Sequence, residues 1–220
     1  MSSYSENNQL FDQILSSNLT LAVIGHTEWV QFISVNKFPA PGSISRSNKF
    51  IELPAGGGAV AAIAMARLTT KKVHFFTALG TDHLGRKSKQ IIENFGVIVH
   101  SAWKDCPTRR GISIVDSNGD RSITVIGERI EPTINDDLNW DIIKSCDGVF
   151  VTATNGETIN FSRASKTLTA TPRVKLNSLN SSNTNLDALI GSGLDPDELV
   201  KNSLLNNPPK LRIWTEGAHG

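Results

Sequence analysis

The sequence has few of the features that mark membrane, secreted or nucleic-acid-binding proteins. Its most apolar run, Ala59–Ala66, is eight residues long, well short of the roughly 20 residues that a membrane-spanning helix needs. The first twenty residues contain no Lys or Arg, so they do not resemble a signal peptide. The net charge is +1, from 22 Lys and Arg against 21 Asp and Glu, which leaves no electrostatic surplus for a nucleic-acid backbone. We therefore expect neither a membrane nor a nucleic acid as a partner.

Cysteine is almost absent as well. The chain has only Cys106 and Cys146, and their positions do not have the close spacing that metal ligands show. A disulfide framework and a structural zinc site are thus excluded by composition. The two thiols are typical of a protein in a reducing compartment, and we expect a cytoplasmic location.

What is present is typical of a globular α/β protein. Hydrophobic residues make up 39% of the 220 positions, and a chain of this length suits one α/β domain, with or without a small appendage. Short β-rich runs alternate with helix-like runs, which predicts a mainly parallel sheet covered by helices. The strands are expected at 21–24, 29–35, 73–79, 97–100, 111–115, 122–126, 148–152, 174–177 and 211–215. The helices are expected at 10–15, 59–68, 85–95, 136–145, 157–169, 187–190 and 195–206.

Two β-rich segments break this alternation, at about 29–53 and 110–126. The second contains Asn118-Gly119, which is a strong indication of a β-hairpin. We expect both segments to form a small β-flap beside the main sheet.

Six short motifs follow one another in an order that matches a known family. They are Gly25 with Phe38-Pro39-Ala40-Pro41-Gly42, Ala55-Gly56-Gly57-Gly58 before an Ala-rich helix, Gly80-Thr81-Asp82-His83-Leu84-Gly85, Pro107-Thr108-Arg109-Arg110 with Asp116–Arg121, Asp195-Pro196-Asp197-Glu198, and Thr215-Glu216-Gly217-Ala218-His219-Gly220. Together, over about residues 21–220, these motifs resemble those of the ribokinase/phosphofructokinase-B (pfkB) family of carbohydrate kinases.

The resemblance implies a fold and an activity. The fold is a ribokinase-like three-layer α/β sandwich with a mainly parallel central sheet and the β-flap as a lid, here a single incomplete domain over residues 1–220. The activity is ATP-dependent phosphorylation of a sugar or sugar-like alcohol, with ATP and Mg²⁺ as cofactors. The family's lid also implies a homodimer through the flap.

The sequence departs from the family pattern in three places. The family carries its catalytic aspartate in a Gly-Ala-Gly-Asp segment after Thr-x-Gly-x-x-Gly, and the sequence reaches Gly220 without one. We therefore expect no catalytic residue within these 220 positions. Val30 and Val60 stand where the family commonly has an Asp and an Asn that grip sugar hydroxyls, so ribose itself is not the expected substrate.

The resemblance places the substrate beside Glu28, Gly56, Gly57 and Gly58. Strand alternation puts Glu28 on the same face as Val30, so its carboxylate could replace the missing Asp. The three glycines would allow a ligand to approach the backbone closely, although a tight strand-to-helix turn also explains them. For Asp82 we favour a helix N-cap over substrate contact.

The resemblance assigns the nucleotide to Thr215, Gly217 and Gly220. It assigns a water-mediated Mg²⁺ contact to Asp195 and Glu198, since Mg²⁺ keeps several of its waters in proteins. The alternative for this acidic pair is a helix N-cap with a capping box. Arg109, Arg110, Arg121 and Arg129 are expected to be solvated flap residues.

The sequence leaves three functions open. The first is a carbohydrate kinase in its full-length form. The second is a non-catalytic family member that binds a sugar or nucleotide, and the third is an inactive truncated remnant. The missing Gly-Ala-Gly-Asp segment motivates the second and the third.

Overall fold

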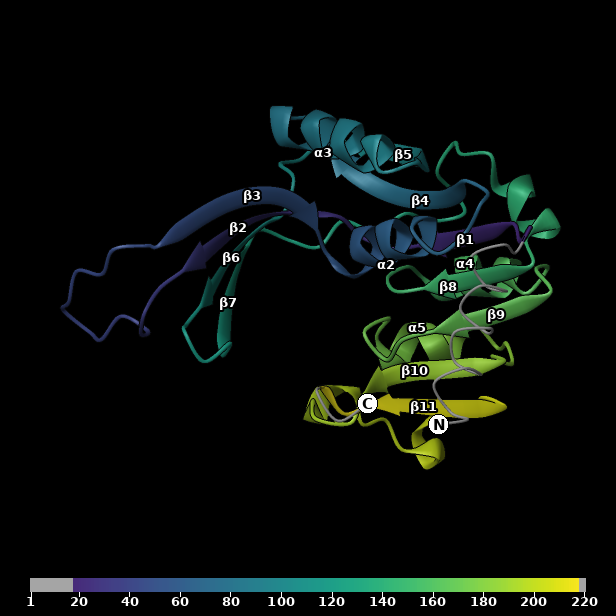
Figure 1. Cartoon of the computed structure of the whole chain (residues 1–220). Coiled ribbons are helices and arrows are strands. Elements are labelled where there is room, and N and C mark those ends of the chain that lie inside the picture. Colours follow the sequence, from purple (N-terminus) through teal and green to yellow (C-terminus); the bar gives the residue numbers. More distant parts are fainter. Residues whose placement is uncertain (1–17, 218–220) are drawn as a thin grey trace, which may run out of the picture.

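The computed structural model describes residues 18–217 and contains two sheets (Figure 1). The helix expected at 10–15 lies outside the described residues. The strands of the main sheet are β1 (Leu21–Ile24), β4 (Val73–Gly80), β5 (Val97–Lys104), β8 (Gly148–Val151), β9 (Thr167–Ala170), β10 (Ala188–Ser192) and β11 (Leu211–Thr215). They lie in the order β11-β10-β9-β8-β1-β4-β5, and all neighbouring pairs are parallel. The expected parallel sheet is confirmed.

The second sheet extends away from the first, and we call it the flap (Figure 1). Its strands are β2 (Glu28–Ser34), β3 (Lys49–Ala55), β6 (Arg110–Val115) and β7 (Arg121–Ile126), in the order β3-β2-β6-β7. Residues 28–34 therefore pair with 49–55 on one side and with the β6 strand of the predicted hairpin on the other. The expectation of a small β-structured flap at 29–53 and 110–126 is confirmed.

Helices cover both faces of the main sheet. The helices α2 (Gly57–Ala66) and α3 (His83–Asn94) contact β1, β4 and β5. The opposite face carries α4 (Gly156–Ser162), α5 (Leu176–Ser181) and a 3₁₀ turn at Trp140–Ser145. Within residues 18–217, no helix is long and apolar enough to span a bilayer.

Alternation along the central strands creates two hydrophobic cores. In β4, Phe75 points into the core beneath α2 and α3, whereas Phe76 points into the core beneath α4 and α5. Both side chains are fully buried. A parallel strand that is covered on both sides is apolar at successive positions, which explains the adjacent pairs Phe75-Phe76 and Ala78-Leu79. The result is the expected three-layer ribokinase-like α/β arrangement.

Five expectations in the second half of the chain were wrong. Residues 157–169 are not one helix, because α4 ends at Ser162 and Thr167–Ala170 forms β9. The β-branched Thr167 and Thr169 favour that strand. The predicted strand at 174–177 is the start of α5, and the predicted helical piece at 187–190 is β10. A short apolar run fits a strand or a helix equally well in isolation. Here pairing with β9 on one side and with β11 on the other makes residues 188–192 a strand.

The expected helix at 195–206 is also wrong. Asp195 does cap a turn that has Pro196 in its first position, but the turn is a 3₁₀ helix that ends at Glu198. A second 3₁₀ turn covers Asn202–Leu204. The Glu198 side chain accepts a hydrogen bond from the Ser192 amide, at 2.7 Å, and this contact ties the turn to the end of β10. The helix expected at 136–145 is likewise only the 3₁₀ turn at Trp140–Ser145.

Asp82 joins helix α3 to the segment that enters the flap. Its carboxylate accepts hydrogen bonds from the Gly85 amide at 2.8 Å, from the Thr108 amide at 2.9 Å and from the Thr108 hydroxyl at 2.6 Å. Burial would raise the pKa of Asp82, but these hydrogen bonds and the charge of Arg86 lower it overall. The expected N-cap is confirmed, and the same side chain also fixes the approach to β6.

We predict that Asp82→Ala lowers the free energy of unfolding by about 2 kcal/mol, because it leaves the cap and two Thr108 donors without their acceptor. Asp82→Asn keeps one acceptor oxygen and should cost about half as much. Urea denaturation measures both. Equal stability of Asp82→Ala and the wild type would contradict the role given to this side chain.

Two histidines lie side by side near the β5 edge of the main sheet. His74 Nδ1 is 3.0 Å from His100 Nε2, and the His100 ring stacks on Phe76, which stacks on Trp140. Burial, together with the charge of His74, lowers the pKa of His100 to about 4. Burial also lowers the pKa of His74. The folded chain therefore favours both rings in the neutral form.

This pair makes stability depend on pH in one direction. The unfolded chain binds more protons than the folded chain below the ordinary histidine pKa of 6.5, so stability falls as the pH is lowered. We predict a falling melting temperature between about pH 6.5 and pH 5, before most carboxylates titrate. His100→Gln should make this slope shallower. A wild-type melting temperature that stays constant over the same interval would contradict the prediction.

Candidate functional site

The candidate substrate site lies where β1 ends and β2 begins. Glu28 is the first residue of β2, and only 9% of its surface is exposed. Its Oε1 atom lies 3.3 Å from His26 Nε2 and 3.0 Å from Arg109 Nη1. Burial would raise the pKa of Glu28, but the His26 hydrogen bond and the charges of Arg109 and Arg129 lower it overall. The site thus holds an ionised carboxylate.

Two polar atoms beside this carboxylate lack partners. Among the described residues, His26 Nδ1 and Arg109 Nε are buried and have no hydrogen-bond partner. Buried polar atoms are nearly always paired, with protein or with another molecule. The ring and the guanidinium therefore have unused hydrogen-bonding capacity next to Glu28, which fits a polar ligand.

The glycine turn between β3 and α2 packs directly against this cluster. Gly56 has a φ of 87°, a conformation that glycine adopts without strain. A Cβ at Gly56 would lie 3.1 Å from His26 Cδ2, and one at Gly58 would lie 2.8 Å from the Gly25 carbonyl carbon. A Cβ at Gly57 would meet only ordinary contacts, at 3.6 Å and beyond. The structure therefore places the glycines of this turn beside the chain that carries His26 and Glu28.

The difference between two of these glycines can be tested with a matched pair of variants. Gly58→Ala forces a methyl group against the Gly25 backbone and should lower the free energy of unfolding by about 3 kcal/mol. Gly57→Ala has room for its methyl group and should change it by less than about 1 kcal/mol. Chemical denaturation of both variants measures the difference. Equal effects would contradict the close contact between β1 and α2.

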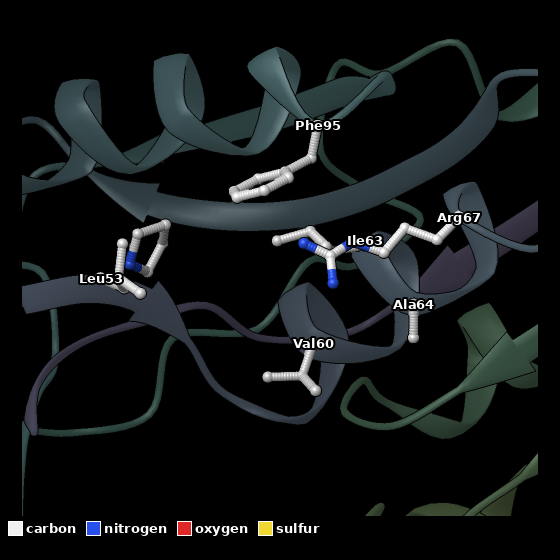
Figure 2. A pocket seen from close by; sticks show the side chains of 7 residues that line it. Leu53, Val60, Ile63, Ala64, Arg67 and Phe95 are labelled. Atoms are coloured by element: carbon white, nitrogen blue, oxygen red, sulfur yellow. The ribbon is translucent and has the colours of Figure 1, made fainter.

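Val30 and Val60 have no hydrogen-bonding side-chain groups. Val30 is buried on the Glu28 face of the flap, since a Cβ at Gly111 would lie 3.3 Å from Val30 and 3.9 Å from Glu28 Oε2. Val60 is 56% exposed and lies on the wall of a hollow of about 270 Å³ (Figure 2). The other lining residues are Leu53, Pro54, Ile63, Ala64, Arg67 and Phe95. Val60 thus presents methyl groups where the family pattern has an amide.

Asp195 and Glu198 follow β10, but their geometry does not fit the expected magnesium contact. Arg173 donates hydrogen bonds to both carboxylates. Asp195 also accepts from the Asp197 amide at 3.0 Å, as the N-cap alternative predicted, and Glu198 accepts from Ser192. Every carboxylate oxygen therefore already has a donor from the protein. The structure shows the N-cap at Asp195, whereas Glu198 accepts from the Ser192 amide instead of completing a capping box.

The expected nucleotide residues are remote from Glu28. Thr215 ends β11, which is four strands away from β1, or about 19 Å at the usual strand spacing. Thr215 and Gly217 are exposed at the carboxyl edge of the sheet, where open α/β sheets bind ligands. Gly220 lies outside the described residues.

Sequence reasoning missed four residues that contact carboxylates. Arg109 and Arg129 were expected to be solvated, and this was wrong. Their side chains are only 18% and 16% exposed, and they pair with Glu28 and Glu131. His26 was not recognised as a site residue, although it lies two residues from Glu28 and alternation places such residues on one side. The fourth residue is Arg173, and no motif marks it.

A parallel sheet with a flap and a polar cluster at its carboxyl edge defines a ribokinase-like α/β protein. The family model described as "pfkB family carbohydrate kinase" matches residues 18–188. The chain belongs to the pfkB family of carbohydrate kinases. No curated protein matches it.

Solved structures show the same fold at low sequence identity. Ribokinase from Thermotoga maritima is 19% identical with a TM-score of 0.58, and the match covers 80% of this chain and 60% of that one. Arabidopsis thaliana ribokinase, solved with ribose and ATP, is 19% identical with a TM-score of 0.58 over 80% and 61% of the two chains. A nucleoside kinase from Methanocaldococcus jannaschii is 13% identical with a TM-score of 0.52 over 81% and 62%. The aligned part of the chain thus spans about 60% of the length of these relatives.

Proposed function

We propose that the full-length form of this protein transfers a phosphoryl group from ATP to a hydroxyl of a sugar or sugar-like alcohol. Membership of the carbohydrate kinase family supports the reaction type. The main support for the position of the alcohol-binding site is the buried Glu28 carboxylate, which His26 and Arg109 hold beside the glycine turn. We call the alcohol the acceptor below.

Each group in the cluster has a role in this proposal. Glu28 Oε2 accepts hydrogen bonds from acceptor hydroxyls, while Oε1 stays engaged by His26 and Arg109. His26 Nδ1 and Arg109 Nε, which lack partners among the described residues, complete the polar contacts to the acceptor. Gly56 and Gly57 let the acceptor approach the backbone closely. The flap then excludes water, which limits ATP hydrolysis.

The proposed ATP site is inferred from where Thr215 and Gly217 lie in the sheet. ATP would lie along the carboxyl edge toward Thr215 and Gly217, because ligands of parallel sheets bind beyond the strand ends. The neighbour solved with ribose and ATP supports ATP as the donor. Mg²⁺ would supply charge neutralisation of the ATP phosphates, and no residue in 18–217 is proposed as its ligand. We likewise assign the proton-accepting base to none of these residues.

The proposal extends to assembly and location. The flap face that carries Glu28 also carries exposed apolar side chains, including Leu53, Ile51 and Val125, which supports a homodimer through the flap. The free thiols Cys106 and Cys146 fit a reducing cytoplasm. The alternative function, sugar or nucleotide binding without turnover, shares the same Glu28 cluster.

The test is ADP release by the full-length protein with a broad panel of sugars and other polyols. We predict acceptor-dependent turnover. Glu28→Gln should lower kcat/KM by about ten- to a hundredfold, through loss of charge-assisted hydrogen bonds. The control is Glu52→Gln, which changes a carboxylate on the opposite face of the flap that accepts a hydrogen bond from Gln31; it should leave kcat/KM unchanged.

The outcomes separate the two functions. A panel that produces no turnover but raises the melting temperature supports the binding alternative, since a ligand of the native state stabilises it. Absence of both turnover and stabilisation with sugars and with ATP would overturn the kinase proposal. Equal effects of Glu28→Gln and Glu52→Gln would overturn the role of Glu28.

A further inference from the structure

Arg173 occupies the centre of the acidic pair that sequence reasoning assigned to magnesium. It lies in the segment between β9 and α5, next to the carboxyl end of the main sheet. Its Nε donates to Glu198 Oε1 and its Nη2 donates to Asp195 Oδ2. One planar guanidinium therefore bridges two carboxylates, a geometry that suits Arg better than Lys.

The remaining carboxylate oxygens are also engaged. Glu198 Oε2 accepts from the Ser192 amide at 2.7 Å, and Asp195 Oδ1 accepts from the Asp197 amide at 3.0 Å. Glu198 is only 8% exposed, so it has little access to the water shell that a hydrated Mg²⁺ retains. A cation at this pair would have to share each oxygen with a donor that the protein already supplies.

The charge of Arg173 is fixed. Its hydrogen bond to Glu198, against the effect of burial, together with the charges of Glu198, Asp195 and Asp197, raises its pKa. An arginine side chain in proteins stays protonated. A divalent cation at the same carboxylates would therefore sit beside a permanent positive charge, and the two would repel each other.

The same segment is held from a second side. Arg129 donates from Nη1 to the carbonyl oxygen of Arg173 at 3.0 Å, and Arg129 also pairs with Glu131 at 2.6 Å. The Arg173 position is thus connected to the chain after the flap as well as to the turn after β10. These contacts hold the backbone that carries the guanidinium.

We propose that Arg173 is the built-in counter-ion of Asp195 and Glu198 and takes the place of a divalent cation there. The three side chains form a clamp that joins the segment after β9 to the turn after β10. In this protein the acidic pair recruits no metal, and Mg²⁺ that accompanies ATP is held without it. The clamp requires neither an acceptor nor a nucleotide, so it stands or falls independently of the kinase proposal.

The probe is Mn²⁺ alone, whose binding to the full-length protein is followed by the relaxation rate of water protons. We predict that the wild type and the Asp195→Asn/Glu198→Gln double variant give the same Mn²⁺ titration. Arg173→Gln exposes both carboxylates and should bind Mn²⁺ at least about tenfold more tightly than the wild type. Mg²⁺ should compete for this new site.

The matched control is Arg173→Lys, which keeps a positive charge between the acids and should titrate like the wild type. Circular dichroism establishes that each variant is folded, and the comparison of wild type with the double variant does not depend on Arg173→Gln. The proposal is overturned if the wild type binds Mn²⁺ at a site that the double variant lacks. It is also overturned if folded Arg173→Gln gains no Mn²⁺ binding.

Discussion

The Glu28 cluster depends on one close contact between backbones, where Gly58 at the start of α2 lies against Gly25 at the end of β1. A Cβ on Gly58 would come within 2.9 Å of three backbone atoms of Gly25 and His26, so no other residue type fits without displacement. This contact holds the glycine turn beside the chain that leaves β1 for the flap. Because His26 and Glu28 belong to that chain, the contact also sets where the polar cluster lies.

Electrostatics then determine the chemistry of the cluster. A carboxylate as buried as Glu28 is costly unless it is paired, and the cationic partner comes from a distant segment, as Arg109 at the entrance to β6. The site therefore forms only when the flap strands are paired, because Glu28 begins β2 and Arg109 directly precedes β6. The Arg173 clamp applies the same principle at the other end of the edge, where one guanidinium pairs with two acids.

The prediction from sequence was accurate where a pattern is local. The runs LAVI and VHFFTAL, the Asn-Gly hairpin, the Asp82 cap and the glycine turn all fold as their composition indicates. It failed at 157–206, because α4 and β9, α5 and β10 are short segments whose state is chosen by neighbouring strands. It also assigned Mg²⁺ to Asp195 and Glu198, because the motif contains the two acids but gives no sign of Arg173, which donates to both of them.

The sequence by itself determined the parallel α/β sheet and the flap, because hydrophobic periodicity and turn residues act over a few neighbours. The grouping of Glu28 with the glycines was implied by the family resemblance. Only the tertiary structure decided the partners of the charged groups. Arg109 and Arg173 are separated from their carboxylate partners by 22 residues or more in the chain, and such pairs form only when strands from distant segments align at one edge. Their distances and burial, which fix both charge and ligand access, exist only in the folded chain.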